Sequence, residues 1–192
     1  RAQILDMPPH PALGPIYEVS LHKDKPFVAM KFIDGGSLQG RYRKEGKLTV
    51  AQVCEIAQHL ADGLDALHEN GQVHGDINMG NVLIGPDNTC FLTDFHITAV
   101  AEITTFALNE KAPLGYIPCM APEQWNGETL LPQTDVYQFA VLIYELLSGQ
   151  RPFIHTNLFE MQQAIAKETP PSITSLAPDL PMKFDAIFAK AL

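Results

Sequence analysis

The feature that most constrains the fold is a stretch that is apolar on nearly every face. Residues 135–147 read Asp-Val-Tyr-Gln-Phe-Ala-Val-Leu-Ile-Tyr-Glu-Leu-Leu, with Thr134 as the expected N-cap and Gly149 just beyond the predicted end. A helix of this kind is stable only when other elements cover all of its sides. We therefore expect the rest of the chain to pack around one buried central helix.

A second helix is predicted from a capping signal followed by helical periodicity. Thr49-Val-Ala-Gln52 is a capping-box pattern, and apolar residues then recur every three or four positions up to Leu67, before Gly71. Further helices are expected over residues 158–167 and 181–192, and the end of another over residues 1–7. The second half of the chain is thus predicted to be mainly helical.

Short apolar segments around turn signals predict two hairpins. Residues 16–21 and 27–33 flank the polar residues 22–25, and residues 82–84 and 91–93 flank Gly-Pro-Asp-Asn at 85–88. Residues 95–133 show little periodicity and contain four prolines, so they are expected to form a long functional loop. Together with the helices, these segments indicate an α+β fold.

Three polar side chains stand at the ends of the second predicted hairpin. Asp76 and Asn81 are five residues apart before it, and Asp94 follows it, so the hairpin should return Asp94 to the other two. A carboxylate can accept the proton of an attacking hydroxyl, and carboxylate and amide oxygens can hold magnesium on nucleotide phosphates. Taken alone, the His-x-Asp-x4-Asn pattern is weak and favours a polar turn between two strands.

Three further segments follow in a definite order. They are Asp94-Phe-His96, a stretch from Gly115 that ends in Ala-Pro-Glu123, and Asp-Val-Tyr at the start of the central helix. With residues 74–81 they resemble the catalytic loop, magnesium loop, Ala-Pro-Glu segment and central helix of eukaryotic-type protein kinases, closest to bacterial serine/threonine kinases. The resemblance covers essentially the whole chain.

The resemblance implies an α+β, protein-kinase-like fold with a mainly helical C-terminal lobe. Residues 1–34 would be a remnant of the N-terminal lobe, with the end of helix C, two strands and the hinge. Residues 35–192 would be the C-terminal lobe, truncated before its last helix. No Gly-rich loop and no strand lysine precede Arg1, so we expect the chain to be a piece of a longer protein.

The resemblance also implies roles for individual residues. Asp76 would be the catalytic base, Asn78 stands where the family has its catalytic-loop lysine, and Asn81 and Asp94 would be magnesium ligands. ATP and Mg²⁺ are the implied cofactors, and a protein substrate or regulatory protein is the implied partner. Glu123 would be a structural carboxylate.

The implied adenine site lies at the end of the first predicted hairpin. Met30 would be the gatekeeper, the backbone of Lys31 and Ile33 would meet adenine, and Leu83 would pack beneath it. Apolar residues in strands often only fill a core, and that interpretation stays open for Met30 and Leu83. The family's packing spine would be formed by Leu5, Ile16, His74 and Phe95, anchored by Asp135, and a second stack would be extended by Leu142 and Leu146.

Five positions depart from the family pattern. Asn78 replaces the lysine that neutralises the transferred phosphoryl group, Gly75 replaces an arginine, and His96 replaces a glycine. Arg1 stands where the family has the glutamate of helix C, and Tyr116 stands where serine/threonine kinases have a threonine. The sequence therefore predicts a serine/threonine kinase domain that is weak or inactive as this chain.

Three alternatives remain beside that interpretation. A pseudokinase-like nucleotide-binding scaffold or regulatory module would keep the fold without the transfer step. A small-molecule kinase of the aminoglycoside-phosphotransferase type shares the His-Gly-Asp loop but lacks the protein-kinase features of residues 115–153. The last alternative is a helical domain with no phosphoryl chemistry.

Composition narrows the classes of partner and the compartment. The net charge of −9 argues against nucleic acid, and the apolar run 139–147 is too short to span a membrane. Three widely spaced cysteines without a Cys-x-x-Cys pair indicate neither a disulfide framework nor a zinc site. We expect a cytoplasmic domain with no membrane insertion in this segment.

Overall fold

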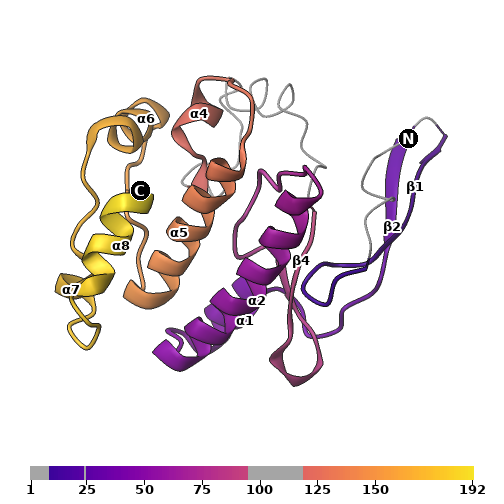
Figure 1. Ribbon diagram of the computed structural model, residues 1–192, viewed down its shortest axis with the longest axis horizontal. Helices are drawn as coiled ribbons and strands as arrows, with labels where there is room; N and C mark the ends of the chain where they lie inside the picture. The colour runs from indigo at the N-terminus through magenta and orange to yellow at the C-terminus, as the bar shows by residue number, and fades with distance from the viewer. Residues whose placement is uncertain (1–8, 24, 95–118) are drawn as a thin grey trace.

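The computed structural model describes residues 9–23, 25–94 and 119–192. A helical body carries a two-stranded hairpin that stands to one side of it (Figure 1). Helix α5 (Pro132–Ser148) lies in the middle of the body and packs against α2 (Val50–Glu69) and α8 (Lys183–Ala191). The helix end expected over residues 1–7 lies outside the described residues.

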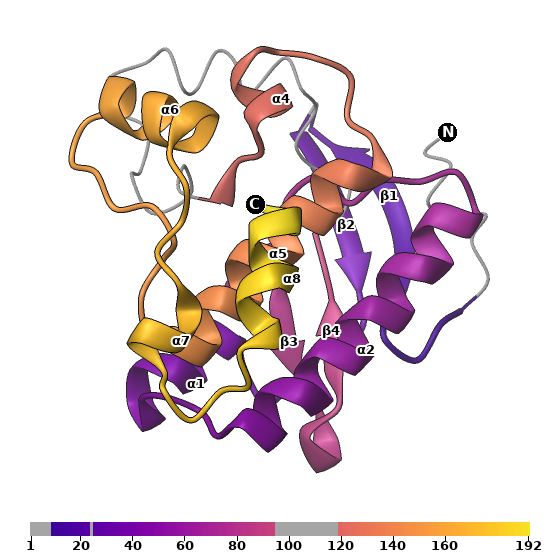
Figure 2. The same cartoon turned by 60° about the vertical axis from the view of Figure 1, so that its left-hand side comes forward.

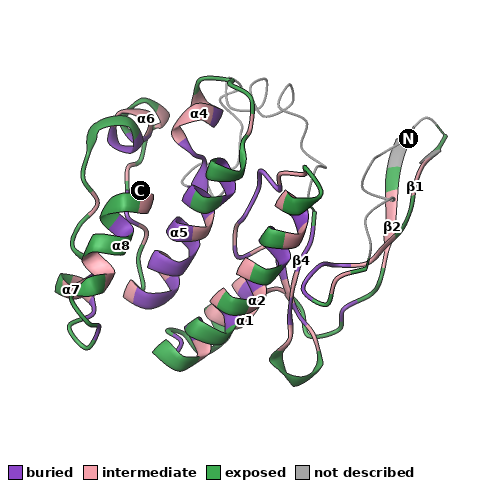
Figure 3. Ribbon diagram, viewed as in Figure 1, coloured by how far each residue is buried: buried purple, intermediate pink, exposed green. Residues whose placement is uncertain are grey.

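Helix α5 is the buried central helix that the sequence predicts. Most of its side chains are buried, as its colouring in Figure 3 shows, and Gly149 ends it in the left-handed conformation with φ +87°. The expected N-cap was wrong, because the helix begins at Pro132 and its N-cap is Leu131. Proline favours the first helical position, and Thr134, one turn inside, accepts the Leu131 N–H at 3.2 Å through Oγ1.

Helix α2 confirms the predicted capping box. The Thr49 side chain accepts from the Gln52 N–H, and the Gln52 side chain accepts from the Thr49 N–H. One face of the helix is buried against α5 and the second hairpin, and the opposite face is exposed (Figure 3). The buried positions are Val53, Ile56, Leu60, Gly63, Leu64 and Leu67.

Four further α-helices complete the described body. They are α1 (Leu38–Glu45), α4 (Pro122–Trp125), α6 (Leu158–Lys167) and α7 (Ile173–Leu176). Figure 2 shows α4 and α6 at the end of the molecule where α5 begins. The loop predicted for residues 95–133 was wrong at its end, which contains α4 and the start of α5; residues 95–118 lie outside the described ones. A four-residue helix is too short to produce a recognisable period.

Both predicted hairpins are present as two-stranded antiparallel sheets. β1 (Ile16–His22) pairs with β2 (Lys25–Met30), and β3 (Val82–Ile84) pairs with β4 (Cys90–Leu92). β2 ends at Met30 rather than at residue 33, because its partner strand begins only at Ile16, opposite Met30. The 3₁₀ turn Pro86–Asn88 joins β3 to β4.

The connection from the first hairpin to α1 is fixed against β3 and the loop before it. The Ile84 N–H donates to the Gly36 carbonyl at 2.8 Å, and the Gln39 N–H donates to the Met79 carbonyl at 3.0 Å. A Cβ atom on Gly35 would lie 2.2 Å from the carbonyl oxygen of Ile84. Only glycine therefore lets the chain cross β3 at this distance.

Alanine substitutions at two nearby glycines should have opposite effects on stability. Gly35→Ala should lower the free energy of unfolding by about 1–3 kcal/mol, because the β3 backbone must move. Gly40→Ala, inside α1, meets nothing closer than Ser37 Oγ at 3.5 Å and should raise stability by up to about 1 kcal/mol. Urea denaturation of the two variants measures the difference, and equal midpoints would contradict the crossing described above.

Candidate active site

The loop between α2 and β3 is held from the central helix by one buried carboxylate. Asp135 is fully buried in the first turn of α5, and its two oxygens accept the N–H groups of His74 at 2.8 Å and Gly75 at 2.7 Å. The ring Nε2 of His68, in the last turn of α2, lies 2.8 Å from the same carboxylate. The carboxylate therefore fixes the start of the loop.

Asp76 lies two residues further along, and two asparagines hold its side chain. It is 5% exposed, and its carboxylate oxygens accept the side-chain N–H groups of Asn78 at 2.9 Å and of Asn81. Asn78 is held in turn, because its Oδ1 accepts the Gly80 N–H at 2.8 Å. The carboxylate thus has a defined orientation before any ligand binds.

The second hairpin returns the chain to this loop. Both the backbone N–H and the hydroxyl of Thr93 donate to the Asn81 carbonyl, at 2.9 and 3.1 Å. Asp94 comes next, in a left-handed conformation with φ +62°. The structure therefore brings Asp76, Asn81 and Asp94 together, in the arrangement expected from their spacing.

The electrostatics of the site favour a proton on Asp76 near neutral pH. Burial raises its pKa to about 7, the hydrogen bonds from Asn81 and Asn78 lower it, and the negative charge of Asp94 raises it. Partial burial also raises the pKa of Asp94. Within the described ranges neither carboxylate has a lysine or arginine partner. Asp76 can therefore exchange a proton with a hydroxyl group at physiological pH.

The available oxygens fit a magnesium ion held together with a substrate. Asn81 uses its amide nitrogen on Asp76, which leaves its Oδ1, and Asp94 supplies a carboxylate. Magnesium commonly takes one or two protein oxygens, with water and phosphate filling the other positions. The described residues hold no group of three or more His, Cys, Asp or Glu side chains suited to a metal, and a two-donor magnesium site does not require one.

The residues expected at adenine lie where the first hairpin joins the body. The Lys31 N–H donates to the Pro15 carbonyl at 2.8 Å, so of its backbone groups only the carbonyl is left for a ligand. Ile33 has a buried side chain, and the described backbone hydrogen bonds outside helices and strands do not involve its N–H or carbonyl. Leu83 is half-buried in β3, opposite Phe91.

Met30 lies against Gly14, a glycine that sequence reasoning did not identify. A Cβ atom on Gly14 would lie 3.2 Å from Met30 Cε and 2.7 Å from Thr93 Cγ2. Gly14 also donates its N–H to the Leu92 carbonyl at 2.7 Å. The absence of a side chain at Gly14 therefore lets Met30 lie close to the residue before Asp94.

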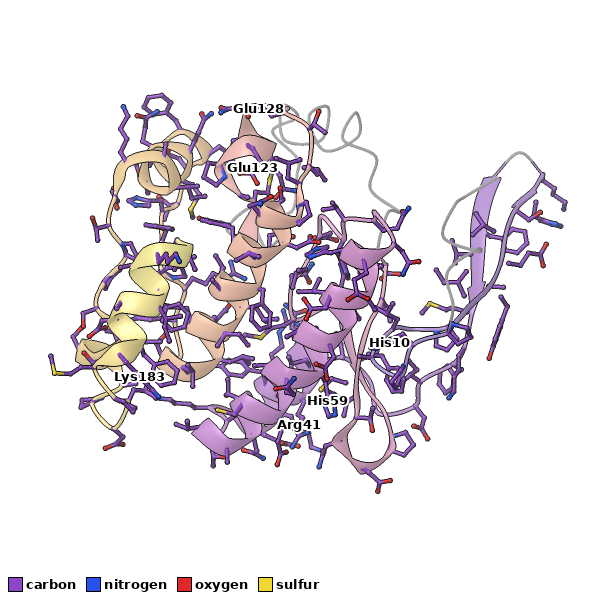
Figure 4. All side chains as sticks on the ribbon, in the orientation of Figure 1. His10, Arg41, His59, Glu123, Glu128 and Lys183 are labelled. Atoms are coloured by element: carbon purple, nitrogen blue, oxygen red, sulfur yellow. The ribbon has the colours of Figure 1, made fainter. Side chains whose placement is uncertain are left out.

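Four other residues in the region were expected from the sequence. Glu123 lies on α4 (Figure 4), where its carboxylate accepts a hydrogen bond from the Thr134 hydroxyl. Leu142 and Leu146 are buried in the core, and Ile16 packs against the same cluster. The remaining expected positions lie outside the described residues; they are Arg1, Leu5, Phe95, His96 and Tyr116.

Two buried glutamines beside the loop were missed. Gln138 on α5 and Gln124 on α4 both donate to the Gly75 carbonyl, at 3.1 and 2.9 Å. The only signal available in the sequence was an amide at a buried position of an otherwise apolar helix, because hydrogen bonds to residues about 50 and 60 positions away leave no local pattern.

Comparison with known proteins gives a consistent result. A family model described as protein tyrosine and serine/threonine kinase matches residues 1–181. Among curated relatives, the chain is 28% identical over 182 residues to a probable serine/threonine-protein kinase PknB of Lactococcus lactis. It is 26% identical over 187 residues to PknB of Mycobacterium leprae and 30% identical over 183 residues to PknD of Mycobacterium tuberculosis.

The aligned part is nearly all of this chain and a minor part of each relative. The three alignments cover 95% of the chain but only 29%, 30% and 27% of the respective relatives. The match to a protein-kinase model favours a protein kinase over a small-molecule kinase. The structure also arranges α5, the loop before β3 and Asp94 as the sequence predicts. The relatives that the chain resembles are serine/threonine kinases. The chain belongs to the protein tyrosine and serine/threonine kinase family.

Proposed function

We propose that the chain is the catalytic part of a serine/threonine protein kinase, which transfers the γ-phosphoryl group of Mg-ATP to protein hydroxyl groups. The observation that carries the proposal is the buried Asp76 carboxylate, held by Asn78 and Asn81 beside Asp94. Asp76 orients the attacking hydroxyl and accepts its proton. The names of the curated relatives support the choice of serine/threonine kinase.

Magnesium, when bound, would bridge the phosphates and neutralise their charge. Asn81 Oδ1 and the Asp94 carboxylate would hold it. The Lys31 carbonyl and the backbone groups of Ile33 would bind the adenine edge, and Met30 and Leu83 would enclose the ring. ATP and Mg²⁺ are thus part of the proposal.

Transfer by this chain is expected to be slow, because Asn78 contributes no positive charge. Its amide nitrogen donates to Asp76 and its oxygen accepts from Gly80, so it orients the base. A lysine at the same position could also neutralise charge on the transferred group, an effect worth several kcal/mol in preorganised sites.

The proposal includes a protein substrate and a cytoplasmic location. In the part of the chain that the structure describes, no helix combines the length and apolar character needed to cross a membrane. The three cysteines are free thiols, which fits a reducing compartment. The net charge of −9 disfavours nucleic acid as the partner.

The proposed base should titrate near neutral pH. ¹³C NMR of the Asp76 carboxyl carbon should show a midpoint near 7, because burial raises its pKa. The native state then retains a proton that the unfolded chain has lost between about pH 4 and 7, so this group should lower stability as pH rises through that range. The transfer rate should rise over the upper part of the same range, as the base loses its proton.

Asp94→Asn should lower the Asp76 midpoint, because it removes a nearby negative charge. Asp87→Asn, on the exposed turn after β3, is the matched control and should leave the midpoint unchanged. A midpoint near 4 in the unsubstituted protein would contradict the electrostatics described for this site.

Substitution of the base should separate transfer from binding. In the whole protein, Asp76→Asn should reduce phosphorylation of a protein substrate on the order of 100-fold, because proton transfer is lost. Mg²⁺-dependent thermal stabilisation by ATP should remain in that variant and weaken in Asp94→Asn. Radiolabel transfer and thermal-shift titration measure the two effects, with Asp87→Asn as control. Undiminished transfer by Asp76→Asn would rule out Asp76 as the base.

A further inference from the structure

The peptide group before Asp76 makes its hydrogen bonds to side chains. The Gly75 carbonyl accepts two N–H groups, from Gln124 Nε2 at 2.9 Å and Gln138 Nε2 at 3.1 Å. The N–H of the same peptide, on Asp76, donates to His74 Nδ1 at 3.2 Å. The orientation of this peptide therefore depends on α4 and α5.

The peptide group after Asp76 is held in the same manner. The Ile77 N–H donates to Gln138 Oε1 at 2.8 Å, and the Asp76 carbonyl accepts from the amides of Asn78 at 3.2 Å and Asn81 at 2.9 Å. Gln138 therefore contacts both peptide groups that flank Asp76. Its amide accepts on one side of the base and donates on the other.

Gln138 makes these contacts from a buried position of the central helix. It is 2% exposed and lies three residues after Asp135, on the same side of α5. Its amide orientation is fixed by chemistry, since the Ile77 N–H can only face an oxygen. A buried amide is costly unless it is hydrogen-bonded, and here the amide makes three hydrogen bonds to the loop and to Gln124.

Gln124 extends the contact to residues 119–125, which include α4. It is 4% exposed, and its Oε1 accepts the Ala121 N–H and Gln138 Nε2, both at 2.8 Å. Its Nε2 donates to Gly75. The two amides thus form one buried bridge from residues 119–125 to the peptides around Asp76.

We propose that Gln138 is a positioning residue that orients Asp76, and that Gln124 makes this orientation depend on the placement of residues 119–125. The proposal deepens, and rests on, the kinase function proposed above. When residues 119–125 shift, the Gly75 carbonyl loses one donor and Gln138 loses its side-chain partner. Orientation of the base is then linked to the placement of α4 and the three residues before it.

The first test measures the loop without measuring transfer. Gln138→Met keeps the side-chain size and removes the hydrogen bonds, so the Ile77 amide should exchange with solvent about tenfold faster. Gln133→Met, at an exposed position of α5, should leave the Ile77 exchange rate unchanged.

A second control separates positioning from general loss of stability. Ile173→Val truncates a buried side chain on α7 outside the site and should destabilise the whole fold. Compared with this variant at equal global stability, Gln138→Met should still show the faster Ile77 exchange. Equal Ile77 exchange rates in the two variants would overturn the proposal.

Gln124→Met tests the coupling and serves if Gln138→Met does not fold. Gln124 does not contact Ile77, yet its substitution should speed Ile77 exchange several-fold through Gln138 and Gly75. No effect beyond that of Ile173→Val would refute the coupling.

In the transfer assay, both glutamine variants should lower kcat while the KM for ATP stays constant. If even the unsubstituted protein transfers no phosphate, the proposed function fails, whereas the exchange results still decide whether the glutamines position the peptide groups that flank Asp76.

Discussion

The site depends on the carboxylate of Asp135, a charge buried in the first turn of the central helix. It accepts the N–H groups of His74 and Gly75 and contacts the His68 ring, so it joins α2, α5 and the loop at one point. Loss of the carboxylate would leave two N–H groups without their partner, a cost of about 1–3 kcal/mol for each buried one. The burial of α5 and the position of Asp76 are thus parts of one arrangement.

The larger elements could be predicted because their signals are local and redundant. Helix α2 is predicted twice, by the capping box of Thr49 and Gln52 and by the spacing of its apolar residues. Helix α5 is predicted to be buried because it is apolar on nearly every face. Where two local signals compete, as Pro132 and Thr134 do for the start of α5, the sequence alone did not rank them correctly. Helix α4 was missed because its four residues are shorter than the pattern that reveals a helix.

Only the site residues that belong to one sequence motif and the hairpin after it could be predicted. The spacing of Asp76 and Asn81, with a hairpin leading to Asp94, is readable along the chain. Asn78 was recognised as a replacement for lysine, but its bond to Gly80 and its hold on Asp76 depend on how the loop folds. Gly14 and the two glutamines act across distant parts of the sequence, so no local pattern identifies them.

The conformation of Gly75 limits how this loop can change during evolution. Its φ of +75° suits glycine, and a Cβ atom there would lie 2.7 Å from Cδ1 of Leu130. An arginine at this position, as in the family pattern, would therefore need a strained backbone and a small shift of the Leu130 side chain. The end of a leucine side chain can turn aside, so the backbone conformation is the lasting obstacle. A lineage that carries Gly75 would thus regain an arginine there at a cost in stability that no change at residue 130 removes.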